Sequence, residues 1–224
     1  MSALADSVAA APRVQAARAA LAGRPVWVVG GTVRDALLGR DVDLDLAVDG
    51  DPEEAARALS RALGGPAFQL SEAFGAWRVV TRDPAFVCDI SRLQGETIEE
   101  DLRGRDFTVN AMALPLEGGE LVDPTGGLED LERRVLRLAS TSAYEADPLR
   151  PLRLVRFATE LGFAPDPEAE RMTREAAPAV AQASGERIFA ELRRIVVADR
   201  VLDGLDLADS LGVLAAVLPE LCRL

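Results

Sequence analysis

The chain has 224 residues, 49% of them hydrophobic, which is enough for one large domain or for a domain with a helical extension. Its 25 basic and 37 acidic residues give a formal net charge of −12, which argues against a protein that coats itself with nucleic acid. The sequence contains no His and no Lys, so all its basic residues are arginines. This excludes Ser-His-Asp triads, histidine metal sites, Schiff-base lysines and the Walker lysine.

The cysteine count and the N-terminal sequence bear on the cellular compartment in which the protein works. Cys88 and Cys222 are too few for a disulfide framework or a cysteine zinc site. No apolar run approaches the roughly 18 residues of a membrane span, and residues 1–24 lack a secretory signal pattern. We therefore expect a cytoplasmic protein that uses carboxylates, arginines, backbone amides and a metal ion, a set that suits the movement of phosphate groups.

Strands and helices interleave in the first part of the chain, as in an α/β domain. Apolar runs predict strands at residues 26–29, 43–48, 76–81 and 85–90, the last two joined by a turn at 82–84. Helices are expected at residues 7–22 and 32–38, and after Asp51, a helix cap, as far as Gly64-Gly65. We assign residues 1–138 to this domain.

Strand signals cease near residue 140. Four helical segments separated by Gly, Pro and Asp follow, at residues 148–161, 166–176, 185–198 and 202–218. We therefore predict a second, all-helical domain over residues 139–224.

A glycine turn followed by two aspartates is the most informative pattern. Gly30 and Gly31 end an apolar run and open a helix that carries Arg34, a turn that lets backbone N–H groups approach an anion. Asp43 and Asp45 lie two residues apart, so a strand would place both on one face. Together these features suit Mg²⁺-assisted phosphoryl or nucleotidyl transfer; each alone is equally explained by a plain turn or by solvated loop acids.

Asp89 is a lone acid within an apolar strand. An uncompensated carboxylate is costly there, so we expect it to face a metal, a cation or solvent. Beside Asp43 and Asp45 it is a candidate third carboxylate, either as a metal ligand or as the general base for an attacking hydroxyl. A strand end that faces water is the alternative.

Two later segments carry polar residues suited to a nucleotide. Arg105 is a candidate for phosphate, and Asp106 and Asn110 are candidates for ribose hydroxyls, although a capped helix start explains this segment about as well.

Further on, Asp147, Arg150, Arg153 and Arg156 follow one another at intervals of three residues. On a helix they form one slowly rotating stripe, with Asp147 and Arg150 offered to a nucleobase and the other two arginines to phosphates. An N-cap at Asp147 and a solvated arginine stripe are the structural alternatives.

Five segments, in order, resemble the motifs of the class II tRNA nucleotidyltransferase (CCA-adding enzyme) and bacterial poly(A) polymerase family, within the superfamily of DNA polymerase β. They are Gly30-Gly31-x-x-Arg34-Asp35 with Asp43-x-Asp45; Arg105 to Ala111; Asp123 to Leu131; Asp147-x-x-Arg150; and Ser184 to Ile188. The resemblance runs from about residue 25 to the C-terminus.

The resemblance implies an α/β nucleotidyltransferase head (DNA polymerase β-like) with a mixed, largely antiparallel sheet, followed by an all-α helical neck. It implies that Asp43 and Asp45 bind the catalytic metals. We expect Mg²⁺ there, with Asp89 completing the site and Gly30, Gly31 and Arg34 binding the triphosphate. The second segment then binds ribose and phosphates. Asp147 with Arg150 becomes the protein template for incoming CTP and ATP, with Arg153 and Arg156 in phase.

Three departures from the family pattern bear on specificity. Ala146 stands where the family usually has Glu, and Gly104 stands where it usually has a first arginine. The stretch between Asp89 and Asp101 is short, as in the CC-adding branch, whereas full CCA-adding relatives usually have a longer flexible loop there.

We therefore expect a template-independent RNA nucleotidyltransferase that adds C and/or A to the 3′ end of tRNA from CTP or ATP, with CC addition alone favoured by the short loop. The expected partners are the tRNA 3′ end and the nucleotide, with no membrane and no protein partner. Two alternatives remain: a non-catalytic nucleotide- or RNA-binding remnant, favoured by the acidity, and a nucleotidyltransferase that acts on a small molecule or a protein.

Overall fold

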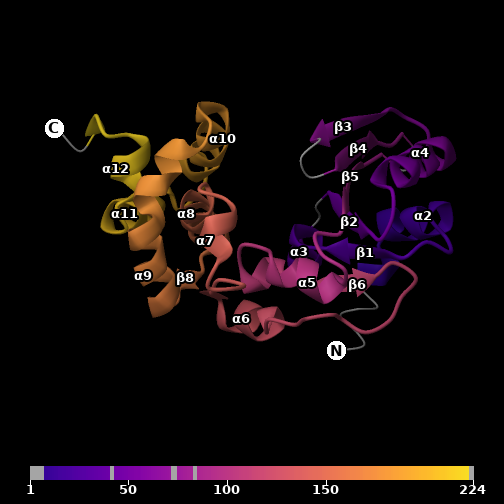
Figure 1. Ribbon diagram of the computed structural model, residues 1–224, viewed down its shortest axis with the longest axis horizontal. Coiled ribbons are helices and arrows are strands. Elements are labelled where there is room, and N and C mark those ends of the chain that lie inside the picture. The colour runs from indigo at the N-terminus through magenta and orange to yellow at the C-terminus, as the bar shows by residue number, and fades with distance from the viewer. Residues whose placement is uncertain (1–7, 41–42, 72–74, 83–84, 222–224) are drawn as a thin grey trace. The chain divides into compact units, whose positions relative to one another are not determined.

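The computed structural model describes residues 8–40, 43–71, 75–82 and 85–221, and the chain divides into two compact units (Figure 1). The first comprises Met1–Arg103 and Asn110–Gly127, and the second comprises Gly104–Val109 and Leu128–Leu224. The chain thus enters the second unit briefly, returns to the first, and leaves it again after Gly127. The boundary predicted between residues 138 and 139 stays a prediction.

A six-stranded mixed sheet forms the centre of the first unit. Its strands are β1 (Val26–Val29), β2 (Leu44–Val48), β3 (Ala67–Ser71), β4 (Ala76–Val80), β5 (Val87–Arg92) and β6 (Ala113–Pro115), in the order β3-β4-β5-β2-β1-β6. Strands β2 and β5 are parallel, and the other neighbouring pairs are antiparallel. The mixed, largely antiparallel sheet is therefore confirmed. The sequence did not predict the two edge strands, β6 and β3, and Phe68 and Leu70 of β3 are exposed.

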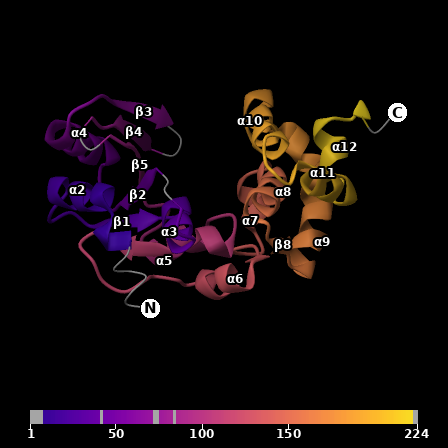
Figure 2. The same ribbon diagram turned by 180° about the vertical axis from the view of Figure 1, so that it is seen from behind.

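Helices α2 (Pro12–Ala20), α3 (Gly31–Leu37), α4 (Pro52–Leu63) and α5 (Ile98–Arg103) complete the first unit. Helix α4 begins as predicted, because the Asp51 side chain accepts a hydrogen bond from the Glu53 amide at 2.9 Å, and it ends before Gly64. It packs on β3, β4 and β5, with α2 beside it (Figures 1 and 2). Helix α3 packs on β1 and β2 and so brings its first turn to the start of β2. Two residues of the predicted turn, 83–84, lie outside the described residues.

The second unit consists mainly of helices. They are α6 (Gly127–Arg133), which begins at the last residue of the first unit, α7 (Ala143–Ala146), α8 (Arg150–Leu161), α9 (Pro167–Ala176), α10 (Gly185–Val196), α11 (Val201–Ser210) and α12 (Val213–Val217), with 3₁₀ turns at Thr108–Asn110 and Ala177–Gln182.

Two details of the sequence reading are wrong here. The strands β7 (Val135–Leu136) and β8 (Ala164–Pro165) form a short parallel pair, so strand structure does not cease near residue 140. The helix predicted at 202–218 is two helices, because Gly212 takes the left-handed conformation (φ 72°) between α11 and α12.

Helix α8 is the centre of the second unit. It packs against α10 and α11, and Gly204 of α11 lies so close that an added Cβ would sit 2.3 Å from the Thr159 hydroxyl oxygen. The fully buried Phe107 meets Phe157 of α8 edge-on, with ring centroids 5.6 Å apart. This contact fixes the segment Gly104–Val109 on α8. None of the helices in the described ranges is long and apolar enough to cross a membrane.

Candidate active site

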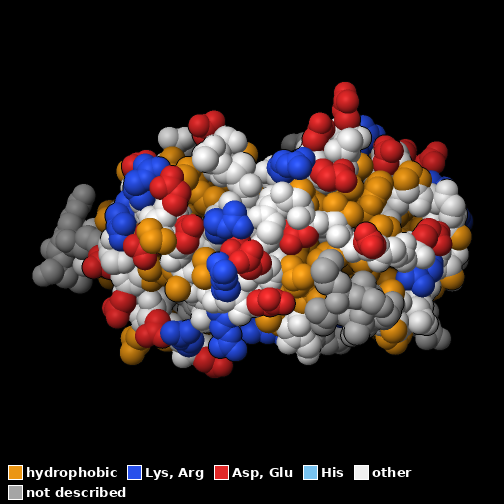
Figure 3. All heavy atoms as spheres, turned by 90° about the horizontal axis from the view of Figure 1, so that it is seen from below, with side chains coloured by type: hydrophobic (Ala, Val, Ile, Leu, Met, Phe, Trp, Pro, Cys, Tyr) orange, Lys and Arg blue, Asp and Glu red, His pale blue; other side chains and the backbone are white. Residues whose placement is uncertain are grey.

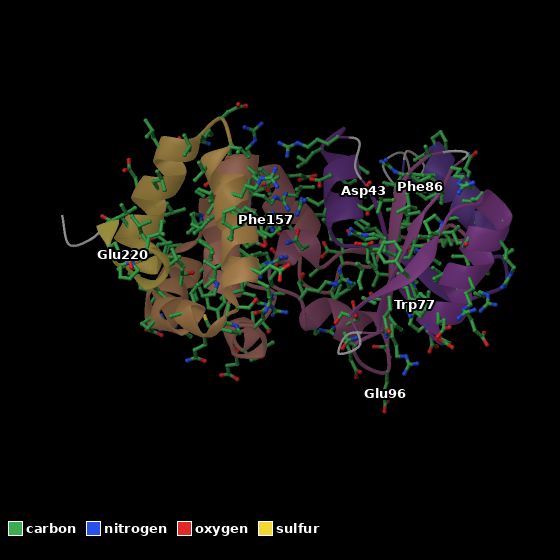
Figure 4. The ribbon with its side chains drawn as sticks, turned by 90° about the horizontal axis from the view of Figure 1, so that it is seen from above. Asp43, Trp77, Phe86, Glu96, Phe157 and Glu220 are labelled. Atoms are coloured by element: carbon green, nitrogen blue, oxygen red, sulfur yellow. The ribbon has the colours of Figure 1, made fainter. Side chains whose placement is uncertain are left out.

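Acidic side chains lie on neighbouring strands in the middle of the sheet. Asp45 of β2 is directly opposite Asp89 of β5 in the parallel pairing, and Asp89 is directly opposite Arg78 of β4. Asp43, labelled in Figure 4, is exposed just before β2, whereas Asp45 and Asp89 are half-buried. Because alternate residues of an extended chain share a face, Asp43, two residues before Asp45, lies on the same face as Asp45 and Asp89. We call Asp43, Asp45 and Asp89 the carboxylate row.

Thr32 of α3 fixes the backbone that carries two members of the row. Its buried hydroxyl donates to the Asp43 carbonyl at 2.9 Å and accepts from the Asp45 amide at 2.7 Å. Sequence reasoning missed this residue, although it stands in the glycine turn, because the hydroxyl meets β2 only after α3 has packed on the sheet.

The glycine turn lies against Asp45. Gly30 has φ 62° and ψ −126°, a conformation that L side chains disfavour. A Cβ at Gly31 would lie 3.6 Å from Asp45 Oδ2 and 3.6 Å from Arg34 Nη2. The turn therefore brings backbone close to a carboxylate of the row without a side chain between them.

Arg34 connects the glycine turn to Asn110, the last residue of the 3₁₀ turn that precedes β6. Its Nε and Nη2 donate to the Asp35 carboxylate at 2.9 and 2.6 Å, and its Nη1 donates to Asn110 Oδ1. The guanidinium is buried, so the predicted triphosphate ligand Arg34 contacts protein oxygens here. The structure thus brings together Arg34 and Asn110, two residues predicted from separate motifs.

Asp89 faces a cation, one of the three surroundings predicted for it. The Nε and Nη2 atoms of Arg78 each lie 2.7 Å from one oxygen of the Asp89 carboxylate. The hydrogen bond to Asp89, followed by the charges of Asp43 and Asp45, raises the pKa of Arg78 against the effect of burial. Sequence reasoning missed Arg78, because strand pairing alone makes it the neighbour of Asp89.

In the second unit, Arg153 of α8 holds Asp106. Its Nε and Nη2 lie 2.9 and 2.7 Å from Asp106 Oδ2, while Nη1 lies 3.4 Å from the Glu191 carboxylate of α10. Burial lowers the pKa of Arg153, but the charges of Asp106 and Glu191 outweigh this effect and raise it. The predicted ribose ligand Asp106 is itself buried.

Arg156 lies deeper in the same cluster. It donates to Glu191 and, at 2.9 Å, to Glu160, and its guanidinium carbon stands 3.7 Å from the centre of the Phe157 ring labelled in Figure 4. Its side chain is 2% exposed, and burial lowers its pKa. A residue predicted to face phosphate is thus enclosed by protein.

Asp147 and Arg150 lie at the start of α8. Asp147 Oδ1 accepts from the Leu149 amide at 3.0 Å, and Oδ2 pairs with Arg187 of α10 at 2.6 Å. Helix α8 begins at Arg150 without a side-chain cap, so Asp147 closes the preceding turn and the predicted helix start at residue 148 is wrong. Arg150 donates to the backbone carbonyls of Gly104, Arg105 and Ala143, and burial lowers its pKa.

The predicted site residues are divided between the two units. The first unit holds Gly30, Gly31, Arg34, Asp43, Asp45, Asp89 and Asn110. The second holds Arg105, Asp106, Asp147, Arg150, Arg153 and Arg156.

The donors of the first unit fit a divalent cation. Asp43 and Asp45 offer hard carboxylate oxygens from an exposed and a half-buried position, as Mg²⁺ prefers. Their field, with that of Asp89, acts on the buried Cys88 thiol, whose pKa is raised first by burial and then by these charges. Over the described ranges, no group of three or more His, Cys, Asp or Glu is arranged to hold a metal. Asp43 and Asp45 are therefore the candidate cation ligands, with Asp89 held by Arg78.

Comparison with known families decides the affiliation. Residues 26–96 and 77–137 match the family model described as "Poly A polymerase head domain". The chain belongs to this family. Residues 162–224 also match the model described as "Probable RNA and SrmB- binding site of polymerase A". These matches confirm the resemblance inferred from the five motifs.

Three known proteins show how similar this chain is to members of the family. A CC-adding tRNA nucleotidyltransferase of Geobacter sulfurreducens is 42% identical over 186 residues, 83% of this chain and 43% of the relative. An A-adding tRNA nucleotidyltransferase of Deinococcus radiodurans is 43% identical over 200 residues, which cover 87% of this chain and 45% of the relative. The structure of a Thermotoga maritima CCA-adding enzyme complexed with tRNA is 30% identical with a TM-score of 0.85, covering 98% of this chain and 55% of that one. The chain spans about half the length of the curated relatives it matches.

Proposed function

We propose that this protein is a Mg²⁺-dependent tRNA nucleotidyltransferase of the cytoplasm that adds C, A or both to the tRNA 3′ end from CTP or ATP and releases pyrophosphate. The observation that carries the proposal is the carboxylate row beside the Gly30-Gly31 turn. The relatives also support the proposal, because they are named as CC-adding and A-adding tRNA nucleotidyltransferases. The same row weighs against a non-catalytic remnant.

The residues of the first unit divide the work of phosphate transfer. Asp43 and Asp45 hold the cation, and Thr32 keeps their backbone in place. A bound divalent cation supplies stabilisation of the charge that develops as the primer 3′-hydroxyl displaces pyrophosphate. The glycine turn offers its backbone to the triphosphate, and Arg34 with Asn110 braces that turn. Asp89 serves as the third carboxylate.

We place base selection on Asp147. Its side chain is 21% exposed and is oriented by Arg187, whereas the N–H groups of Arg150 described above point to backbone carbonyls. Arg153 and Arg156 are bound to Asp106, Glu191 and Glu160. In this proposal Arg150 and Arg153 act as positioning residues for the segment Gly104–Val109, Arg156 holds Glu191 and Glu160, and Arg105 remains the candidate for phosphate.

The product is proposed to be CC. Similarity does not separate the candidates, because the CC-adding and A-adding relatives are 42% and 43% identical. The irregular stretch between the end of β5 at Arg92 and the start of α5 at Ile98 is short, and this favours addition of C alone.

The decisive assay uses a tRNA minihelix that lacks its three terminal nucleotides, incubated with CTP, ATP and Mg²⁺. We expect extension by two C residues. A complete CCA end would overturn the restriction to CC. Absence of any extension by folded protein would favour the alternative of a nucleotide-binding protein without activity. The net charge of −12 and the mixture of acidic and basic side chains on the face shown in Figure 3 are compatible with that alternative.

A further inference from the structure

One positive charge lies on the line of the carboxylate row. Arg78 of β4 faces Asp89 across the antiparallel pairing of β4 and β5, and Asp89 faces Asp45 across the parallel pairing of β5 and β2. The three residues therefore occupy directly opposed positions on three adjacent strands. Such opposed positions place side chains on the same face of the sheet.

The contact between Arg78 and Asp89 is a two-point contact. Two nitrogens of the guanidinium each meet a separate carboxylate oxygen at 2.7 Å, the fork geometry that fixes orientation as well as charge. The two side chains are 38% and 33% exposed, so water and ions reach the pair. A cation that approaches the row therefore finds both Asp89 oxygens already bound.

The charges of the cluster favour a function for this pair beyond a surface ion pair. The three carboxylates of the row together carry a formal charge of −3, and Arg78 supplies one positive charge in direct contact with one of them. The charges of Asp43 and Asp45 add to the effect of Asp89 in raising the pKa of Arg78. Arg78 is thus placed to weaken the binding of any cation to the row.

We propose that Arg78 is the resident counter-cation of the carboxylate row: it holds Asp89 while no divalent cation is bound, and it competes with that cation for Asp89. This inference rests on the proposed function, in which Asp43 and Asp45 hold Mg²⁺. Arg78 is a positioning residue, since it acts through Asp89. Binding of the cation loosens the Arg78–Asp89 pair and frees the third carboxylate.

The charge effect has a calculable size. A single and a double positive charge roughly 6 Å apart in a water-like dielectric repel enough to change a binding constant about tenfold. Removal of this repulsion, together with the release of Asp89 from its two bonds, should make Arg78→Gln bind Mn²⁺ at least about tenfold more tightly than the unmodified chain at low ionic strength. Its melting temperature without Mn²⁺ should fall, because Asp89 loses its partner, and Mn²⁺ should raise that temperature by more than in the unmodified chain.

The test is a titration of the full chain with Mn²⁺, followed by the electron paramagnetic resonance signal of the free ion. Arg57→Gln is the matched control, since Arg57 pairs with Glu53 on the surface of α4, and its Mn²⁺ affinity should not change. Equal or weaker binding by Arg78→Gln overturns the inference. Absence of Mn²⁺ binding by the unmodified chain overturns the proposed cation site instead, so the two failures are distinct.

Two further variants test whether Arg78 competes with the cation for Asp89. Arg78→Lys retains the charge but cannot make both bonds to Asp89, so it should bind Mn²⁺ more tightly than the unmodified chain, though by less than Arg78→Gln. It replaces that variant if the glutamine does not fold, and equal or weaker binding again counts against the inference. In an Asp89→Asn background the gain from Arg78→Gln should shrink; an undiminished gain would show that Arg78 does not compete for Asp89.

Discussion

The two units use charged residues in opposite ways. In the sheet unit, the carboxylates of β2 and β5 lie at exposed or half-buried positions, where they can meet a cation. In the helical unit, the arginines of α8 are bound by acids and carbonyls of their own unit, and Arg156 is 2% exposed. Regular spacing of polar residues therefore does not show whether they can bind a ligand, because burial decides whether a side chain contacts a ligand or a neighbouring residue.

The sharpest test of this contrast removes a charge from the row. Asp43→Asn or Asp45→Asn should reduce nucleotide incorporation by roughly three orders of magnitude or more, because each loses a cation-binding charge without losing volume. The unfolding midpoint should hardly change. Asp49→Asn, at an exposed position just after β2, is the control and should retain activity. Unchanged incorporation by either row variant would remove that aspartate from catalysis.

In the helical unit the same kind of change should act on stability. Glu191 is 8% exposed and binds both Arg153 and Arg156, so Glu191→Gln removes a charge that the two guanidinium groups share and leaves Arg156 with Glu160 alone. The free energy of unfolding in urea should fall by about 1–3 kcal/mol. Glu186→Gln, on an exposed position of α10, should change it little. A stable Glu191→Gln variant would contradict the view that this cluster is structural.

Asp147 sharpens the comparison, because it belongs to the helical unit but retains some exposure. Asp147→Ala should reduce the preference among the four nucleoside triphosphates in a competition assay about tenfold, the loss of one directed hydrogen bond. Glu145→Ala, an exposed neighbour on α7, should keep the preference. If Asp147→Ala lowers only the melting temperature, its bonds to the Leu149 amide and to Arg187 are its whole role.

Local patterns foretold most of the fold. The strands β1, β2, β4 and β5 are apolar runs, and α4 carries its own start and stop signals in Asp51 and Gly64. Strand β3 was missed because it lies at the edge of the sheet, where the exposed Phe68 and Leu70 give no core pattern. The break at Gly212 was missed because a helix tolerates a single glycine unless the chain must turn there.

The sequence predicted only those features of the site that follow from residue spacing within a single strand or helix. Alternation along a strand predicted the shared face of Asp43 and Asp45, and Asp89 was expected to face a metal, a cation or solvent. The residues that orient them, Thr32 and Arg78, come from another helix and another strand, and the partner of Arg156, Glu191, is 35 positions away in the chain. Such pairings arise from tertiary structure, for which a single sequence carries no periodic signal.

The excursion of Gly104–Val109 into the second unit has a consequence for inheritance. A crossover at any single point of the gene between these two units would either carry Phe107 away from Phe157 and Asp106 away from Arg153, or split the sheet unit by removing β6. Neither half could be exchanged as a ready-made cassette. We therefore expect the sheet unit and the helical unit to descend together, as one hereditary block, with new partners appended only outside it.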